Sequence, residues 1–416
     1  MTHLSKFKKQ DLFIASIFAV LIILAFIVEP LETMFSGFVQ ILVSPSILLS
    51  DYLLIGGLGA TLLNVALTLM LNVGIVYALK LRITGPIFAC LLTIAGFAFF
   101  GKNIFNAIPI YFGIYLYSIV TKSDLKGRIL VILLSSGISP IVSFLMFGLG
   151  IELYFSIPLG IATGVLVGFI LPAFNAHALK FHQGYNLYNT GFSMGVLSML
   201  LTGIISAFAT INRSVEVYGG YHTPLLIATV IVSVAMIIAA FVFNPRIYKL
   251  YPEILKKSGR LMTDFVQVAG RDATMLNVGI MGLLSIGLVL LLEVQINGPI
   301  MGAILTIIGF AAFGKHPMNS IPVVMGAMIA VAITPIELTI GPILAIFFVT
   351  GLAPIAGRYG FMAGLLAGFI HLLITPLALA FQGGFDLYNN GFAAGFVAAL
   401  LSSVFSRFSK TQDVTL

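Results

Sequence analysis

Two lysines that stand within apolar sequence are the first candidates for chemistry. Lys102 and Lys315 each follow a hexapeptide that begins and ends with glycine, residues 96–101 and 309–314. Both stretches match the opening of a phosphate-binding loop, but Asn103 or His316 stands where a serine or threonine would hold magnesium. We therefore exclude nucleotide binding and expect a helix that ends at each glycine, with the lysine at its negative end.

The sequence around these lysines is apolar enough to lie within a membrane. Their role therefore depends on how deep in the membrane they lie. At the membrane surface, Lys102 and Lys315 would extend their ammonium groups into water. Within the membrane, each would need a partner and would mark a solute pathway. We include both among the substrate-binding candidates, together with Asn106 and Asn319 of the Asn-x-Ile-Pro sequences that follow them.

A second pair of related blocks combines tyrosine, asparagine and glycine. Residues 184–192 have the sequence Gly-Tyr-Asn-Leu-Tyr-Asn-Thr-Gly-Phe, and residues 384–392 have Gly-Phe-Asp-Leu-Tyr-Asn-Asn-Gly-Phe. Such polar residues within apolar sequence predict an interrupted helix that faces a cavity. The alternative is close helix packing at Gly191 and Gly195, with asparagines bonding between helices. The substrate-binding candidates in these blocks are Asn186, Tyr188, Asn189, Asp386, Tyr388 and Asn389.

The two related halves differ at ionisable positions. Asp386 stands where the first half has Asn186, and His371 stands where the first half has Leu171. Ionisable residues within a membrane segment are functional by default, and proton coupling would use such groups. We therefore expect Asp386 to lie close enough to Lys315 to pair with it. The alternative for His371 is a hydrogen-bonded histidine of the core.

The sequence offers little support for an enzyme. Residues 191–195, Gly-Phe-Ser-Met-Gly, match the nucleophile elbow of serine hydrolases, but Ala393 replaces the serine in the second block and no strand precedes either block. Cys90 is the only cysteine, so an intrachain disulfide and a cysteine-based metal cluster are excluded. We predict no catalytic residues, no metal and no cofactor.

Composition indicates a membrane protein. Hydrophobic residues make up 60% of the 416 residues and charged residues only 8%, which leaves too little polar surface for a soluble fold. Apolar runs of about twenty residues recur, and each can span a bilayer. The predicted class is an all-α polytopic membrane protein whose partner is the lipid bilayer. The net charge of +7 is a signal of topology and not of nucleic-acid binding.

The chain is an internal duplication. Residues 85–109 recur without a gap as residues 298–322. The two tyrosine–asparagine blocks are separated by fewer residues along the chain than these two copies are. We therefore divide the chain into a first repeat, residues 1–212, and a second repeat, residues 213–416, which has lost a short stretch before its last block. Each repeat has seven apolar segments, or five membrane crossings if residues 85–120 form a re-entrant hairpin. The whole chain therefore has about 10–14 transmembrane segments, with re-entrant or broken helices among them.

The positions of the basic residues predict the orientation. Lysine and arginine are retained on the cytoplasmic side, and nearly all of them can lie on one side if the first helix leaves the cytoplasm and its counterpart, about 223–243, returns to it. Arg213 is the exception. The two repeats are then inverted relative to each other, both termini are cytoplasmic, and the protein is a multi-pass protein of the plasma membrane.

The repeated blocks carry a resemblance to known families. The paired Gly-Pro-Ile, Gly-Lys, Asn-x-Ile-Pro and Leu-Tyr-Asn-x-Gly-Phe sequences resemble a bacterial family of integral membrane proteins that is defined only as a domain of unknown function. The order of Gly85-Pro86 and Gly184-Tyr185-Asn186 is also similar to that in urea transporters. Thr84 and Leu187 depart from the urea-transporter pattern, so this likeness implies a duplicated, channel-like pore but no particular solute.

These patterns together predict a function in transport. Inverted repeats with broken helices are typical of secondary transporters, whose solute site lies at the midplane between the repeats. We expect a transporter or channel for a small polar solute, with a proton or ion as a candidate coupling partner. The alternative is a membrane scaffold or sensor that transports nothing. Whether the chain forms a homo-oligomer stays open.

Overall fold

The computed structural model describes residues 16–48, 50–209, 211, 222–261 and 263–408. These residues form helices and no β-sheet, apart from an isolated bridge between Asp51 and Phe100. The predicted all-α class is confirmed. Several residues used to predict the topology lie outside the described ranges, as does the boundary between residues 212 and 213; these residues are Lys6, Lys8, Lys9, Arg213 and Lys410.

The first repeat begins with a helix at Ser16–Val28 that meets the next helix at an angle of 113°. The following helices are α2 (Leu31–Val43), α3 (Tyr52–Ile55), α4 (Gly57–Ala78), α5 (Gly85–Phe97), α6 (Ile104–Val120), α7 (Ile129–Ser135), α8 (Pro140–Phe147), α9 (Leu153–Phe181) and α10 (Asn189–Phe208). Short 3-10 turns at Lys126–Arg128 (η1) and Ser136–Ile138 (η2) flank α7.

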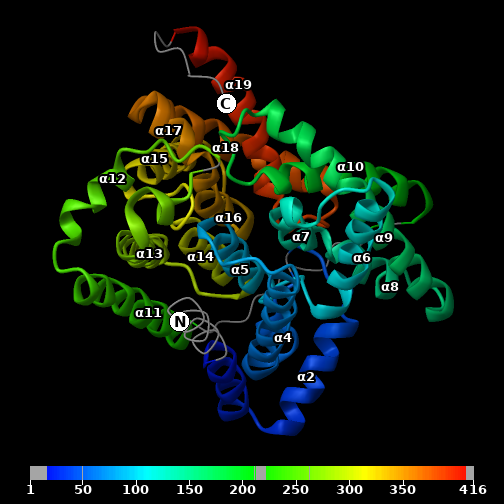
Figure 1. The fold of residues 1–416 in the computed structure, drawn as a ribbon. Helices are drawn as coiled ribbons and strands as arrows, with labels where there is room; N and C mark the ends of the chain where they lie inside the picture. The colour runs from blue at the N-terminus through cyan, green and yellow to red at the C-terminus, as the bar shows by residue number, and fades with distance from the viewer. Residues whose placement is uncertain (1–15, 49, 210, 212–221, 262, 409–416) are drawn as a thin grey trace.

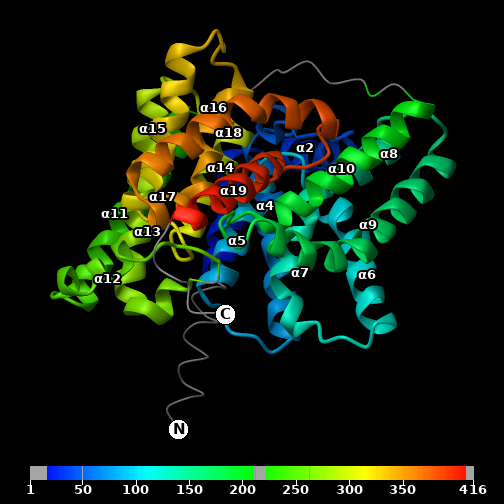
Figure 2. The same ribbon diagram turned by 90° about the horizontal axis from the view of Figure 1, so that it is seen from above.

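The second repeat has a similar order of elements, except that one helix kinked at Gly270 stands for α3 and α4. Its helices are α11 (His222–Phe243), α12 (Tyr251–Leu255), α13 (Phe265–Leu291), α14 (Gly298–Phe310), α15 (Pro317–Ile333), α16 (Ile340–Phe348), α17 (Ala353–Tyr359), α18 (Phe361–Gln382) and α19 (Asn389–Phe408). The 3-10 turns are Ile247–Lys249 (η3) and Val349–Leu352 (η4). In Figure 2, helices α6–α9 lie on the right and α11–α13, α15 and α17 on the left, with α5 and α14 between them.

Helices α5 and α14 pack along each other at the centre, where their labels lie together in Figure 1. A methyl group on Gly96 would lie 2.8 Å from the Gly302 carbonyl oxygen, so the backbones are too close for any larger residue there. The end of each helix lies beside the start of the other, because Gly298 is next to the Phe99 carbonyl and Gly85 is next to the Ala312 carbonyl. The pair is therefore antiparallel.

The described residues contain nine helices that are long and apolar enough to cross a membrane, or ten if the bent pair at Ser16–Val28 and Leu31–Val43 counts as one span. Helices α5 and α14, with 13 residues each, are about 20 Å long at 1.5 Å per residue, which is shorter than the roughly 30 Å of a hydrocarbon core. Helix α6 packs along α9 instead of folding back along α5, and α15 likewise packs along α18.

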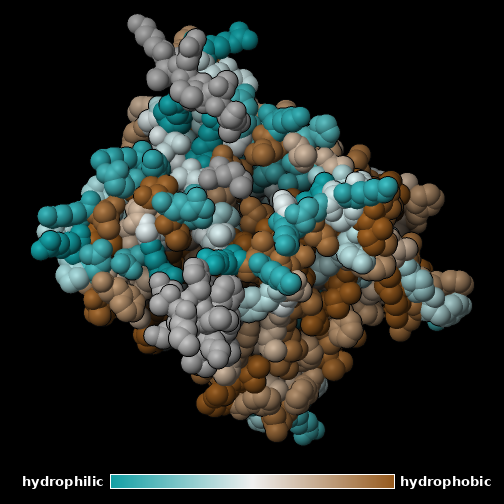
Figure 3. All heavy atoms as spheres, in the orientation of Figure 1, coloured by the Kyte–Doolittle hydropathy of each residue, from teal (hydrophilic) through white to brown (hydrophobic). Residues whose placement is uncertain are grey.

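The outer surface of these helices is apolar. Large side chains such as Leu166 of α9, Ile204 of α10 and Ile231 of α11 are exposed by 54%, 58% and 61%. The face drawn in Figure 3 is brown over its lower and right-hand parts, whereas polar residues gather at the left, where α12 lies in Figure 1. Hydrocarbon must cover such a surface, so the chain is a multi-pass membrane protein.

The residues missing from the second repeat belong to one connection. In the first repeat, five residues separate α8 from α9, and α9 has 29 residues. In the second repeat only Gly360, with a φ of 91°, separates α17 from α18, and α18 has 22 residues. The shortened loop and the shortened helix account for most of the difference in spacing between the two pairs of blocks.

Candidate functional site

Both lysines lie in a turn that the protein builds twice. Helix α5 ends at Phe97 and α14 ends at Phe310, four residues before the predicted glycines. Asn64 of α4 donates hydrogen bonds from Nδ2 to the carbonyl oxygens of Ala98 and Lys102, at 2.8 and 2.9 Å. In the second repeat Asn277 of α13 donates two equivalent bonds, both of 2.7 Å, to the carbonyls of the corresponding residues, Ala311 and Lys315.

The asparagines that follow the lysines hold the other side of the turn. Asn106 accepts a hydrogen bond from the Asn103 backbone and donates from Nδ2 to the Gly101 carbonyl, both at 3.0 Å. Asn319 makes the matching bonds to His316 and Gly314, at 2.9 and 2.8 Å. These bonds satisfy groups that a helix start leaves unpaired. The predicted solute ligands Asn106 and Asn319 therefore have structural partners in this state.

The Lys102 side chain is fully buried within its own repeat. Its Nζ donates a hydrogen bond to Ser136 Oγ, in the 3-10 turn η2, and one of 3.3 Å to Tyr111 Oη of α6. Tyr111 Oη in turn donates to Asn72 Oδ1 of α4 at 2.7 Å. Lys102 is thus held by a chain of neutral polar groups that all belong to the first repeat.

The Lys315 side chain is also fully buried, but it reaches the other repeat. Its Nζ donates to Thr350 Oγ1 in η4 at 2.8 Å and to Tyr188 Oη of the first repeat. The same Nζ lies 4.7 Å from the centre of the Tyr188 ring and 5.1 Å from that of Phe310, close enough for cation–π attraction. Lys315 therefore joins the two repeats through Tyr188.

Neither buried lysine forms an ion pair with a carboxylate of the described residues. The ion pair of Lys256 with Glu253 lies at the exposed surface, where the hydrogen bond from Lys256 lowers the pKa of Glu253 below its usual value. A lysine at the centre of a membrane helix costs about 2.5–3.5 kcal/mol on insertion scales. Two lysines retained at equivalent buried positions without a counter-charge therefore point to a role beyond folding.

Each tyrosine–asparagine block docks into the opposite repeat. The backbone N–H of Leu187 donates to the Gly351 carbonyl at 3.0 Å, and that of Leu387 donates to the Gly137 carbonyl at 2.9 Å. The rings of Tyr188 and Tyr388 pack against each other with centroids 4.7 Å apart. The blocks thus meet at the interface of the two repeats.

The two tyrosines differ in their polar partners. Tyr188 Oη accepts from Lys315, whereas Tyr388 Oη lies 3.3 Å from Thr93 Oγ1. Lys102, the equivalent of Lys315, instead donates to Tyr111 of its own repeat. Lys315 therefore bonds to a tyrosine of the opposite repeat, and Lys102 does not.

The side chains at positions 186 and 386 accept hydrogen bonds from the backbone of their own blocks. Asn186 Oδ1 accepts from the backbone of Tyr188 at 2.9 Å, and its Nδ2 donates to the Gly391 carbonyl at 2.8 Å. Asp386 Oδ1 accepts from the backbone of Tyr388 at 2.8 Å, but its Oδ2 has no hydrogen-bond partner among the described residues. Asp386 forms no ion pair with Lys315, so the predicted pairing is wrong.

The remaining block residues bond to neighbours in their own repeat. Asn189 Oδ1 lies 2.8 Å from His182 Nε2, and its Nδ2 donates to the Asn175 carbonyl of α9. Asn389 Oδ1 accepts from Asn390 at 2.9 Å. His371 Nε2 bonds to Asn390 Oδ1 at 3.2 Å, which is the behaviour of a hydrogen-bonded core histidine. These amides bond to neighbouring residues and not to the lysines.

The blocks interrupt the helices at the predicted place, because α10 and α19 begin at Asn189 and Asn389 after a break. Close packing is also present. A methyl group on Gly391 would lie 3.0 Å from the Gly191 Cα, so the starts of α10 and α19 touch through backbone. Interruption and packing, the two alternatives expected from the sequence, therefore occur together.

Sequence reasoning missed the hydroxyl partners of the lysines. Ser136 and Thr350 are equivalent, and each begins a Ser/Thr-Gly-x-x-Pro sequence, at 136–140 and 350–354. The offset that aligns the other matches would instead pair Thr350 with Gly137, so a gap-free comparison misses this equivalence. No group of three or more histidine, cysteine or acidic side chains that could hold a metal lies together in the described part of the chain.

A family model described as "Protein of unknown function (DUF1576)" matches residues 31–207 and 243–407. The chain belongs to this family. No curated protein and no solved structure matches the chain, so the likeness to urea transporters has no support. The family description assigns no activity, and the function must therefore be argued from the buried lysines and the residues around them.

Proposed function

We propose that this family member is a membrane transporter for a small polar solute that carries negative charge. The observation that carries the proposal is the pair of buried lysines, Lys102 and Lys315, that have no carboxylate partner among the described residues. An anion would supply the missing counter-charge, and hydrogen bonds to ionised groups are about twice as strong as those between neutral groups.

Lys315 is the better candidate for the primary contact with the solute. Lys102 is surrounded by polar partners of its own repeat, Ser136 and Tyr111. Lys315 bonds to Thr350 of its own repeat and to Tyr188 of the opposite repeat, so a movement of one repeat against the other would free one of its hydrogen bonds for a solute. Transporters with two related repeats expose a central site alternately by movements of this kind.

The described state is closed around this centre. Lys102, Tyr188 and Lys315 have no exposed surface, and Tyr388 is exposed by only 1%. A solute would therefore enter after the Tyr188 and Tyr388 rings part, and the proposed gate is this same interface between the repeats. Because two aromatic rings in contact contribute only about 0.5–1.5 kcal/mol beyond the burial of their area, binding of an anion is able to offset their separation.

The test uses purified protein reconstituted in liposomes and a panel of small anions, from chloride and phosphate to short carboxylates. We expect one class of anion to raise the melting temperature in detergent and to show protein-dependent flux. Lys315→Met should abolish both effects, because it removes the charge while keeping a long apolar side chain. The matched control is Lys256→Met, which removes an exposed lysine and should change neither.

The outcome also separates the transporter from the scaffold or sensor. If no anion in the panel stabilises the wild-type protein or crosses the membrane, the transport proposal fails and the scaffold remains. If an anion binds and Lys315→Met binds it equally well, the solute site lies elsewhere. Folding of each variant is checked by the shape of its size-exclusion profile.

A further inference from the structure

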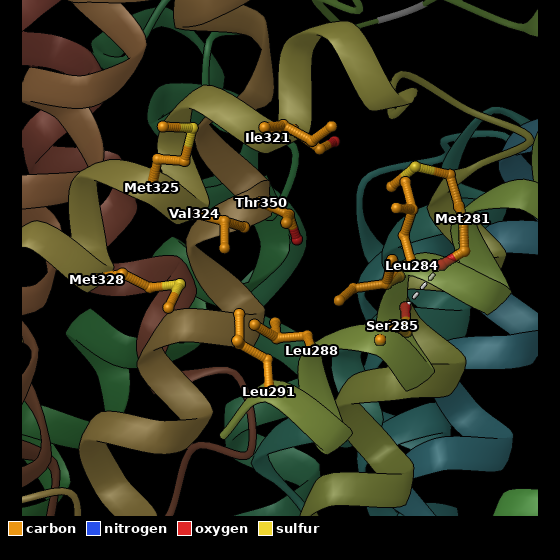
Figure 4. A pocket seen from close by; sticks show the side chains of 13 residues that line it. Met281, Leu284, Ser285, Leu288, Leu291, Ile321, Val324, Met325, Met328 and Thr350 are labelled. Carbon is orange, nitrogen blue, oxygen red and sulfur yellow. Dashed lines mark hydrogen bonds between the residues drawn. The ribbon is translucent and has the colours of Figure 1, made fainter. Parts of the chain in front are cut away.

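A cavity of about 280 Å³ lies between α13 and α15 (Figure 4). Leu284, Ser285 and Leu288 of α13 line one wall, and Val324 and Met328 of α15 line the other. Thr350, which accepts the hydrogen bond from Lys315, also lines the cavity. The cavity therefore extends from the outer helices toward the residue that holds the buried lysine.

The cavity opens sideways, toward the membrane. Leu291, Ile321 and Met325 line its outer part and are exposed by 63%, 42% and 41%, whereas Thr350 is exposed by 2%. The exposed residues belong to the apolar outer surface of α13 and α15, which faces hydrocarbon in a multi-pass membrane protein. Lipid chains are consequently the molecules that stand at the opening.

The equivalent place in the first repeat is filled by the protein itself. Val324 corresponds to Tyr111, and Ser285 corresponds to Asn72, at the offset that also aligns 85–109 with 298–322. Tyr111 lies between α6 and α4 and donates a hydrogen bond to Asn72 at 2.7 Å. The loss of the tyrosine ring at position 324 thus leaves space in the second repeat at the place that the ring occupies in the first.

The lining selects an apolar occupant. Ser285 Oγ and Thr350 Oγ1 both donate to backbone carbonyls of their own helical turns, Met281 and Phe347, at 2.8 Å, so neither has its proton free for a ligand. Met281, Met325 and Met328 contribute flexible side chains that adapt to an irregular chain. Small-molecule sites usually measure about 300–1,000 Å³, so this cavity suits one end of a chain and not a whole lipid.

We propose that this cavity binds the acyl chain of a bilayer phospholipid, which enters between α13 and α15 and ends beside Thr350. The chain takes the place that the Tyr111 side chain occupies in the first repeat. Contact with Thr350 connects the lipid to the hydrogen bond of Lys315. Binding of the chain needs neither an anion nor transport, so it can be tested apart from the proposed solute site.

The test fills the cavity with the residue of the first repeat. Wild-type protein and the variant Val324→Tyr are delipidated in detergent and then titrated with phospholipids that share their chains but differ in headgroup, and bound lipid is counted by native mass spectrometry. We expect wild type to keep one more phospholipid than Val324→Tyr with every headgroup. We also expect the lipid-dependent rise in melting temperature to be smaller in the variant, since a ligand stabilises only the state that binds it.

The matched control is Ile329→Tyr. Ile329 lies on the same helix, is exposed by 42% and does not line the cavity, so this variant should bind lipid like wild type. Val324→Phe fills the cavity without a hydroxyl group and serves if Val324→Tyr does not fold. Equal lipid counts in wild type and either folded cavity variant would overturn the proposal.

A measurement on wild type alone completes the test. A cryo-electron microscopy map of the protein in lipid nanodiscs should show continuous chain density between Leu288 and Val324. An empty cavity in a map that resolves these side chains would also overturn the proposal. All these measurements are made without solute, so their failure leaves the transport proposal standing, and loss of transport in Lys315→Met says nothing about the lipid chain.

Discussion

At the scale of single residues, equivalent positions of the two repeats have different hydrogen-bond partners. Lys102 and Lys315 are equivalent, yet Lys102 is satisfied by Tyr111 within its repeat and Lys315 by Tyr188 of the other. One substitution contributes to the difference, because valine replaces tyrosine at position 324. That substitution removes a hydroxyl partner from the second repeat and leaves a cavity there. The asymmetry that the proposed solute site would need thus arises on a nearly symmetric scaffold.

Asp386→Asn tests whether the carboxyl group at this position is structural. The change introduces the residue that the first repeat has, where Asn186 donates to the Gly391 carbonyl at 2.8 Å. Asp386 Oδ2 has no hydrogen-bond partner among the described residues, so an amide there should gain one bond and raise the free energy of unfolding by about 1 kcal/mol. Denaturant titration of the purified protein in detergent measures this change.

The reverse variant, Asn186→Asp, is the matched control. It removes the donor to the Gly391 carbonyl and should lower stability by about 1–3 kcal/mol. If Asp386→Asn instead lowers stability, or abolishes transport while folding normally, Asp386 has a protonation role that its local hydrogen bonds do not reveal.

At the scale of elements, the short helices α5 and α14 position both lysines, and glycine makes their close packing possible. Gly96→Ala should lower the free energy of unfolding by about 1–3 kcal/mol, the usual cost of overpacking. The reason is that the new methyl group would lie 2.8 Å from the Gly302 carbonyl oxygen, which is backbone and cannot move aside easily. Melting temperatures in detergent, compared at equal protein and lipid content, measure the effect.

Gly74→Ala is the control for this prediction. Gly74 lies within α4, and no atom is within 4 Å of the position that its methyl group would take. Alanine favours a helix over glycine by up to about 1 kcal/mol, so this variant should be neutral or more stable. An equal loss of stability in both variants would show that the α5–α14 contact is not the cause.

Some of these elements could be predicted from the sequence and others could not. The glycine-lysine turns and the breaks before Asn189 and Asn389 follow from residue type, since glycine, asparagine and charge interrupt an apolar helix. The pairing of Asp386 with Lys315 was wrong because neighbouring blocks in the sequence cross to opposite repeats in the fold, and Tyr188 takes the place beside Lys315. The exchange of Tyr111 for Val324 leaves no trace in the hydrophobic pattern, so the cavity was invisible to sequence reasoning.

At the scale of the whole molecule, the duplication and the helical membrane class follow from composition and from the constant offset between matching residues alone. The structure adds that the repeats interlock, because each block bonds to the opposite repeat through Leu187 or Leu387. Sequence comparison of the repeats cannot show such contacts, since it aligns equivalent residues and not neighbouring ones. Their orientation in a membrane stays a prediction, and the antiparallel α5 and α14 agree with an inverted pair.

The orientation can be tested at two equivalent places. Residues 244–256 correspond to α2 at the offset of the other matches, but they contain Arg246, Lys249 and Lys256, whereas α2 has Glu32 and no basic residue. Basic segments stay in the cytoplasm, so we expect residues near 256 to face the cytoplasm and α2 to lie toward the outside.

The measurement is cysteine labelling in intact cells in a background in which Cys90, which is buried, is replaced by alanine. Ser36 and Lys256 are both exposed, so Ser36→Cys and Lys256→Cys introduce accessible thiols. A membrane-impermeant maleimide should label Ser36→Cys in intact cells and Lys256→Cys only after the membrane is permeabilised. Labelling of both from the same side would contradict inverted repeats, because Ser36 and Lys256 lie in equivalent segments and equivalent segments of an inverted pair must lie on opposite faces of the membrane.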